Sequence, residues 1–92
     1  MRKGRLRRRS GDVGFVYEFA FSEEDRLMYR FLDDEGNPRL DADGGFRVAP
    51  VDKVEYLIHH LPANLKQLCA ESGIDFERFR ASFLRPNRQR KR

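Results

Sequence analysis

Hydrophobic and polar residues alternate in the segment GFVYEFAF, residues 14–21. In an extended chain successive side chains point to opposite faces, and this alternation is typical of a strand with one buried face. The two faces would be an aromatic one with Phe15, Tyr17, Phe19 and Phe21 and a second one with Val16, Glu18 and Ala20. We therefore predict a half-buried β-strand in this segment.

The following segment, residues 23–33, fits two patterns. Ser22 and Asp25 resemble the start of a capped helix. Four apolar side chains would then share one helical face, namely Leu27, Met28, Phe31 and Leu32. Leu27, Tyr29 and Phe31 also alternate, however, and SEEDR has a suitable length for a hairpin connection. We favour the hairpin, with the helix as the alternative.

Turn-forming and acidic residues are concentrated in DDEGNPRLDADGG, residues 33–45, which predicts a hairpin tip and an exposed loop. Its acids invite comparison with a calcium-binding loop. That loop needs acids at its first, third and fifth positions, glycine at the sixth and glutamate at the twelfth, and no register here supplies the set. We therefore expect no metal site. Residues 46–49 would form a short strand that ends at Pro50.

The second half of the chain has the apolar spacing of helices. Three helix starts are indicated by capping residues, namely Asp52 with Glu55, Asn64 with Gln67, and Asp75. Pro62 would end the first helix, and Gly73 would end the second as a left-handed cap. The third helix would bury Phe76, Phe79 and Phe83 along one side.

These elements predict one α+β domain over residues 12–84. A small antiparallel sheet from residues 13–49 would pack on three short helices from residues 53–84, and 92 residues allow one domain and little more. No apolar run approaches the roughly 20 residues of a membrane span, and the basic start is not followed by the apolar core of a secretory signal. We therefore expect no membrane partner.

Charge is distributed unevenly along the chain. The net charge is +4, but residues 2–9 and 85–92 hold 11 of the 19 basic residues, while all 15 acids lie between them. We predict that residues 1–11 and 85–92 are disordered arms, because blocks of like charge repel one another. Arginine predominates, and its planar group can grip phosphate oxygens. The predicted phosphate contacts in the arms are Arg2, Lys3, Arg5, Arg7, Arg8, Arg9, Arg85, Arg88, Arg90, Lys91 and Arg92.

A second candidate for nucleic-acid contact is LKQLCAESGIDFERFRASFL, residues 65–84. Its relevant positions are Leu68, the small Cys69, Gly73 at a turn, Ile74 after it, and Phe79 as an anchor. This stretch resembles the helix-turn-helix of DNA-binding proteins. The resemblance implies transcription regulation, with Arg78 and Arg80 of the second helix contacting DNA. Phe76 and Glu77 depart from the polar or basic residues usual at the start of that helix.

The sequence contains no glycine-rich phosphate loop, no nucleophile elbow and no local acid and base pair, so we expect neither an enzyme nor a cofactor. His59, His60 and Cys69 are too sparse for structural zinc. We predict a small regulatory or architectural nucleic-acid-binding protein of a bacterium or phage, with DNA favoured over RNA. It would be cytoplasmic and nucleoid-associated, or nuclear in a eukaryote.

Other functions stay open from the sequence. The acidic body could dock on a basic protein, as in an antitoxin, an inhibitor or an assembly factor. The arms could instead hold ribosomal RNA in a ribosome-associated protein. A homodimer is compatible with each of these hypotheses.

Overall fold

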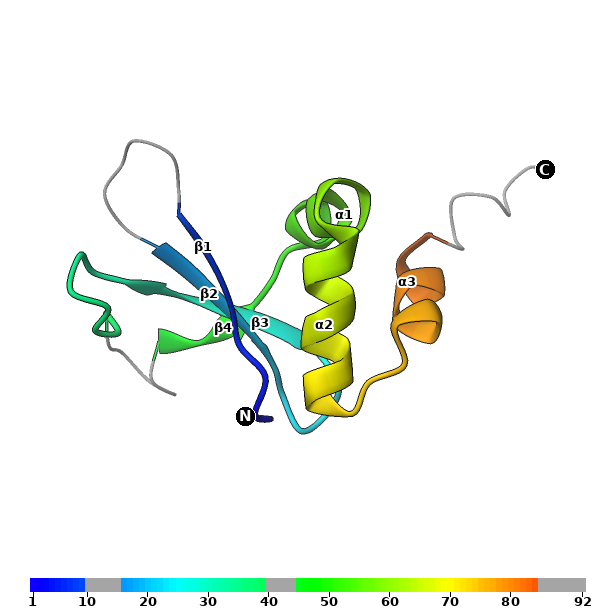
Figure 1. The fold of residues 1–92 in the computed structure, drawn as a ribbon, viewed down its shortest axis with the longest axis horizontal. Helices are drawn as coiled ribbons and strands as arrows, with labels where there is room; N and C mark the ends of the chain where they lie inside the picture. Colours follow the sequence, from blue (N-terminus) through cyan, green and yellow to red (C-terminus); the bar gives the residue numbers. More distant parts are fainter. Residues whose placement is uncertain (10–15, 40–44, 85–92) are drawn as a thin grey trace.

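The computed structural model describes residues 1–9, 16–39 and 45–84. Within these ranges, strands β1 to β4 form one antiparallel sheet in chain order, and three helices follow (Figure 1). The elements are β1 Leu6–Arg9, β2 Val16–Phe21, β3 Leu27–Leu32, β4 Arg47–Val48, α1 Val51–His60, α2 Pro62–Ser72 and α3 Phe76–Leu84. The predicted α+β class, with an antiparallel sheet before three helices, is confirmed.

Strands β2 and β3 form the predicted hairpin, so the helical alternative for residues 23–33 is wrong. Val16 is paired with Leu32 at one end and Phe21 with Leu27 at the other. Ser22 closes the turn, because its hydroxyl accepts hydrogen bonds from the backbone N–H groups of Glu24 and Arg26, each at 3.2 Å. The strand pairing places Phe19 and Phe21 of β2 and Leu27 of β3 in the core, with Tyr29 partly buried against it.

The core lies between one face of the sheet and the helices (Figure 1). Phe19 and Phe21 of β2 are buried, and the ring of Phe21 meets that of Phe79 edge-on, with centroids 5.1 Å apart. The helices contribute Val54, Leu57, Ile58, Leu65, Leu68 and Cys69. The predicted aromatic core face of β2 is confirmed for these two phenylalanines, whereas Phe15 lies outside the described residues.

Two of the three predicted helix starts are wrong. Helix α1 begins at Val51 after Pro50, without a side-chain cap, so Asp52 lies inside the first turn. The carbonyl of Pro50 instead accepts the backbone N–H groups of Lys53 and Val54. Helix α2 begins at Pro62 rather than after Asn64. Proline fits a first helical position because its missing N–H would have no partner there and its φ is already helical.

The predicted turn between α2 and α3 is confirmed at both of its ends. Gly73 has a φ of 75°, in the left-handed region that favours glycine. The N–H of Ile74 then reaches back to the carbonyl of Cys69 at 2.8 Å. The carboxylate of Asp75 accepts the N–H groups of Glu77 and Arg78 at 3.0 and 3.3 Å, which caps α3.

The N-terminal segment is ordered where it is described, so the prediction of a disordered arm over residues 1–11 is wrong for residues 1–9. Strand β1 pairs with β2, from Leu6 opposite Phe19 to Arg9 opposite Val16. The prediction failed because Asp25 and Glu18 neutralise Arg2 and Arg7, and backbone carbonyl groups accept further hydrogen bonds from Arg2 and Arg5. The predicted arm over residues 85–92 lies outside the described residues.

Arg2 fastens the start of this segment to two distant parts of the chain. Its guanidinium donates to the carbonyls of Ser22 at 3.1 Å and Ser72 at 3.0 Å, and it pairs with the carboxylate of Asp25. A Cβ on Gly4 would lie only 2.7 Å from Oγ of Ser72, so glycine permits the close approach to α2. The first residues are therefore part of the folded domain.

The second face of β2 is also buried, which the prediction of a half-buried strand missed. Glu18 is 1% exposed on the face turned away from the helices. Its carboxylate accepts hydrogen bonds from Arg7 of β1 at 2.8 Å and from Arg30 of β3 at 2.7 Å. The guanidinium of Arg30 also lies over the ring of Phe46, 4.3 Å from its centroid. A three-strand charge cluster thus closes the outer face.

Stability should depend on the ionisation of Glu18. Burial acts to raise the pKa of Glu18, but the hydrogen bonds and charges of Arg7 and Arg30 outweigh it and lower the pKa below 4.5. The stabilisation is therefore present above about pH 4.5 and is lost as pH falls through the folded-state pKa. Thermal melts at several acidic pH values should show Glu18→Gln losing less stability on acidification than the parent protein. Identical losses would contradict the assignment.

Candidate nucleic-acid interface

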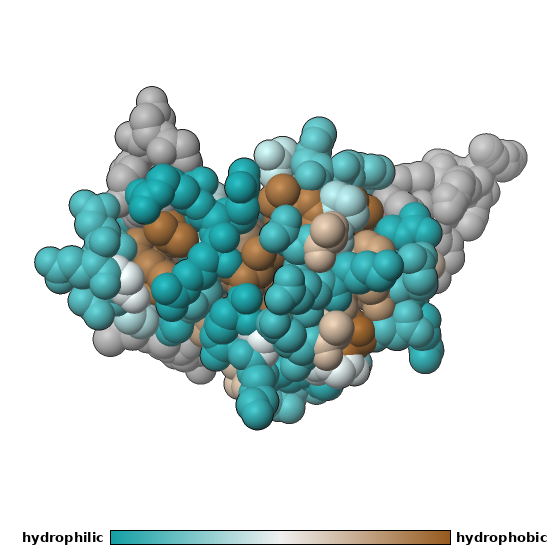
Figure 2. All heavy atoms as spheres, viewed as in Figure 1, coloured by the Kyte–Doolittle hydropathy of each residue, from teal (hydrophilic) through white to brown (hydrophobic). Residues whose placement is uncertain are grey.

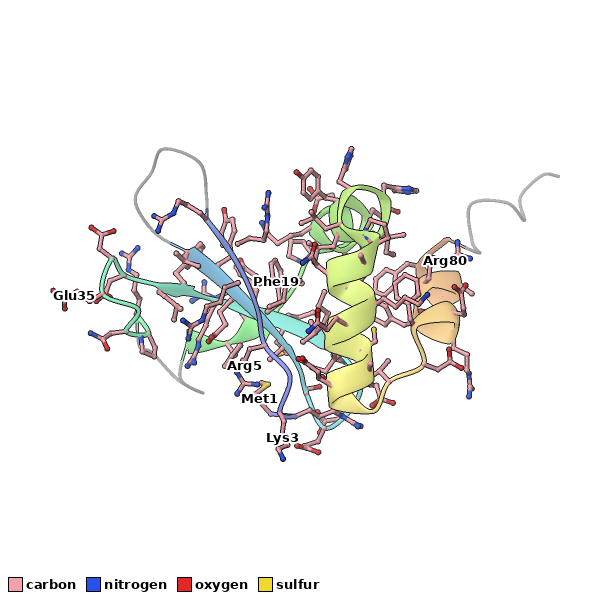
Figure 3. The ribbon with its side chains drawn as sticks, in the orientation of Figure 1. Met1, Lys3, Arg5, Phe19, Glu35 and Arg80 are labelled. Atoms are coloured by element: carbon pink, nitrogen blue, oxygen red, sulfur yellow. The ribbon has the colours of Figure 1, made fainter. Side chains whose placement is uncertain are left out.

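A cleft of about 620 Å³ opens between β1, β2 and the first turns of α1. Its floor is formed by Phe19 and Leu57, both of which are buried, and by the half-buried ring of Tyr17. Figure 3 shows Phe19 between β1 and α2, and Figure 2 shows apolar surface between hydrophilic side chains in this central region. The molecule therefore has an apolar recess with a polar rim.

Two arginines of β1 line this cleft. Arg8 stands opposite Tyr17 in the strand pairing, and Arg9 stands opposite Val16. Both side chains are exposed and make no hydrogen bond or ion pair within the described ranges. Successive side chains of a strand point to opposite faces, so Arg8 shares the cleft face with Tyr17, whereas Arg9 borders the cleft from the edge of the sheet. The exposed guanidinium of Arg8 is therefore available to an anion entering the cleft, and that of Arg9 to an anion at its border.

A third cation, Lys53, reaches the cleft from α1. Its ammonium group lies over the ring of Tyr17, 4.2 Å from the centroid, and 5.5 Å from the centroid of Tyr29. Such contacts use the negative face of an aromatic ring. The rings of Tyr17 and Phe31 lie 5.2 Å apart, so an aromatic cluster continues from the cleft along the sheet. Cations and ring faces are thus adjacent at this site.

Tyr56 stands at the rim of the cleft and is 49% exposed. It packs against His60, one helical turn further along α1, with ring centroids 4.6 Å apart and planes inclined by 32°. This tilted contact covers one side of an otherwise exposed ring. The carboxylate of Asp52 lies on the same α1 side of the cleft and is its acidic member.

The other predicted residues of the N-terminal segment do not converge on this cleft. Arg2 and Arg7 pair with Asp25 and Glu18, as described above. Arg5 donates to the carbonyls of Arg2 and Gly4, at 2.5 and 2.8 Å. Lys3 is exposed and extends away from the body in Figure 3. The structure therefore brings Arg8 and Arg9 to the cleft and uses three other arginines within the fold.

Helix α3 presents a different arrangement of charge. The guanidinium of Arg80 pairs with the carboxylate of Glu77 at 2.9 Å, and Arg78 lines a shallow hollow together with Asp25 and Asp75. Figure 3 shows Arg80 at the far side of α2 from Arg5 and Lys3. The two predicted contact regions, β1 and α3, are therefore separate. Arg85, Arg88, Arg90, Lys91 and Arg92 lie outside the described residues.

Lys53, Tyr56 and Tyr17 were missed as candidate site residues. Lys53, Tyr56 and His60 recur at one-turn intervals along α1. This stripe runs beside the core face of the helix and could have been recognised as a separate surface. Its partner surface on β1 could not be recognised, because residues 1–11 were expected to be disordered.

Comparison with protein-family models, with curated proteins and with solved structures finds no match to this chain. The fold and the cleft together define a small α+β protein with a basic and aromatic recess. Within the described ranges, no three His, Cys, Asp or Glu side chains are grouped so that they could hold a metal ion, and no helix is long and apolar enough to cross a membrane.

Burial and the charge of Asp75 raise the pKa of the Cys69 thiol to about 11.

Proposed function

We propose that this protein binds nucleic acid and that the cleft between β1 and α1 is its contact site. The observation that supports this most is the convergence of Arg8, Arg9 and Lys53 on a recess that also presents aromatic rings. Guanidinium and ammonium groups bind phosphates, and aromatic rings bind bases. A regulatory or architectural role on DNA or RNA would use this site for affinity.

The helix pair α2 and α3 offers a second mode of nucleic-acid contact. Its three-residue turn and its buried Phe79 are compatible with a helix-turn-helix. Asp75 and Glu77 lie at the end of α3 that would face DNA, and Glu77 already engages Arg80. Carboxylates at that position repel the phosphate backbone, so the cleft has the more favourable electrostatics.

An apolar groove favours a second candidate function, protein binding. Val48 and Val51 at its border are 52% and 58% exposed, and Leu27 and Phe79 lie at its base. Apolar surface of this kind is characteristic of protein-protein contact. An antitoxin, an inhibitor or an assembly factor would use such a surface, and a second copy of the chain is another occupant. Sedimentation of the free protein at several concentrations tests that self-association.

Removing both cleft arginines should weaken nucleic-acid binding in a salt-dependent way. Affinity falls as salt rises, so the slope of log affinity against log salt is negative. For Arg8→Ala/Arg9→Ala this slope should become shallower by about 0.7 to 0.9 for each phosphate that the protein no longer neutralises. Fluorescence anisotropy of labelled oligonucleotides at several salt concentrations measures this slope. Deleting residues 1–9 is an unsuitable alternative, because it removes β1 from the sheet.

Two matched controls locate the contact. Lys66→Ala removes an exposed cation of α2 outside the cleft and should leave the slope nearly unchanged. Arg80→Ala tests whether helix α3 contributes to nucleic-acid binding. An unchanged slope in the double arginine variant would contradict the cleft as the site, and a large loss of affinity in Arg80→Ala would favour α3 instead.

A further inference from the structure

We infer that the cleft accepts unpaired nucleotides, so that the preferred ligand is single-stranded nucleic acid or an unpaired loop. A base would stack on Tyr56, and the adjoining phosphates would pair with Arg8 and Arg9. This inference rests on the proposed function and adds the strandedness of the ligand and the role of Tyr56.

The exposed ring of Tyr56 is the first observation that supports this. One side of the ring packs on His60 at 4.6 Å, and about half of the residue remains exposed at the cleft rim. A ring with one side packed and the rest exposed can stack with a flat partner. In a duplex the faces of the bases are covered by their neighbours, whereas an unpaired base offers its face to an aromatic side chain.

The shape of the site is the second observation. Proteins read duplex DNA by inserting a protruding helix or ribbon into a groove. Here the cations and rings surround a recess of about 620 Å³ instead. A recess of this volume lies within the range of about 300 to 1,000 Å³ typical of small-molecule sites. A flexible strand can turn a base into it, while a regular duplex cannot.

The distribution of charge gives the bound strand a direction. Arg8 and Arg9 lie on the β1 side of the cleft, while the Asp52 carboxylate lies on the α1 side with Tyr56. On α1 the charge of Lys53 offsets that of Asp52, so the net positive charge of the cleft lies on the β1 side. The backbone would therefore follow β1, and the bases would point toward α1. Lys53, over the ring of Tyr17, is a third cation that a phosphate inside the cleft can reach.

The test compares four labelled ligands of equal length with the full-length protein: single-stranded DNA, single-stranded RNA, duplex DNA, and an abasic single strand. Tyr56→Ala should weaken binding of the two base-containing single strands by about 5- to 150-fold, the equivalent of 1 to 3 kcal/mol for one stacked base. Binding of the duplex and the abasic strand should hardly change. Tyr56→Phe keeps the ring and should bind like the parent protein.

A spectroscopic measurement separates stacking from simple attraction. The chain has three tyrosines and no tryptophan, so its intrinsic emission reports tyrosine. Stacking of a base should quench this emission, and the abasic strand should not. The quenching should decrease in Tyr56→Ala. If that variant does not fold, His60→Ala keeps the tyrosine but removes its support, and should weaken single-strand binding by a smaller factor.

The outcomes distinguish this inference from the proposed function. Equal affinity for base-containing and abasic strands, with no effect of Tyr56→Ala, would overturn the stacking site even if the arginine variant still loses affinity. Tighter binding of duplex than of single strands would also overturn it. Absence of binding to all four ligands at low salt would refute the proposed function itself. Inorganic polyphosphate could also displace the labelled single strand as effectively as unlabelled single strand does. That result would indicate an anion site without base contact and would contradict the inference.

Discussion

Phe79→Ala should lower the free energy of unfolding by about 3 to 5 kcal/mol, the usual cost of removing a buried phenylalanine ring. Phe79 is 8% exposed and joins α3 to the sheet through the edge-on contact with Phe21. Its ring also lies 4.9 Å from that of Phe83. Because small domains are stable by only about 5 to 15 kcal/mol, this single change removes a large part of the total.

Urea unfolding followed by circular dichroism measures this loss of stability. Arg78→Ala, on the adjacent and exposed position of α3, is the matched control and should change stability by less than about 0.5 kcal/mol. Equal midpoints for Phe79→Ala and the parent protein would mean that α3 does not pack on the sheet in solution.

Glu18→Ala should destabilise the protein by about 3 kcal/mol, at the lower end of the cost of removing one partner from a buried ion pair. The variant leaves Arg30, whose side chain is 18% exposed, without the carboxylate at 2.7 Å. The loss of stability is not larger because Arg7, with a side chain 59% exposed, can return to water.

The two arginines provide the matched comparison for this prediction. Arg7→Ala should cost less than about 1 kcal/mol, because a largely exposed ion-pair partner contributes little. Arg30→Ala should cost more, since it also removes the contact with Phe46. Equal destabilisation by Glu18→Ala and Arg7→Ala, measured by chemical unfolding, would show that the carboxylate is not buried between its partners.

Local sequence patterns correctly predicted the elements that depend on interactions between residues close together in the sequence. Alternation in residues 16–21 correctly predicted a strand with an aromatic core face, although the other face is buried as well. Gly73 and Asp75 determine the turn before α3 through their own backbone and side-chain geometry. The start of α1 was misjudged by the same logic. Asp52 matched a capping pattern, but Pro50 already provided the carbonyl on which the first turn closes.

Strand β1 could not be predicted, because its partners are far away in the sequence. A run of arginines has no apolar pattern of its own, and it is held by Glu18, Asp25 and the carbonyl of Ser72. The candidate site depends on the same pairing. Arg8 and Arg9 were named from composition, but only the addition of β1 to the sheet brings them opposite Tyr56 of α1.

The edge position of β1 links ligand binding to local unfolding. Arg8 and Arg9 belong to a strand with a neighbour on one side only, so its opening is among the easier partial unfolding steps of the sheet. When β1 separates from β2, the cleft loses one of its walls. Any ligand that requires both arginines therefore binds only the closed form, and its measured affinity includes the fraction of molecules in which β1 is paired. Under the proposed function, loss of remote contacts such as those of Arg2 would weaken affinity without touching the ligand.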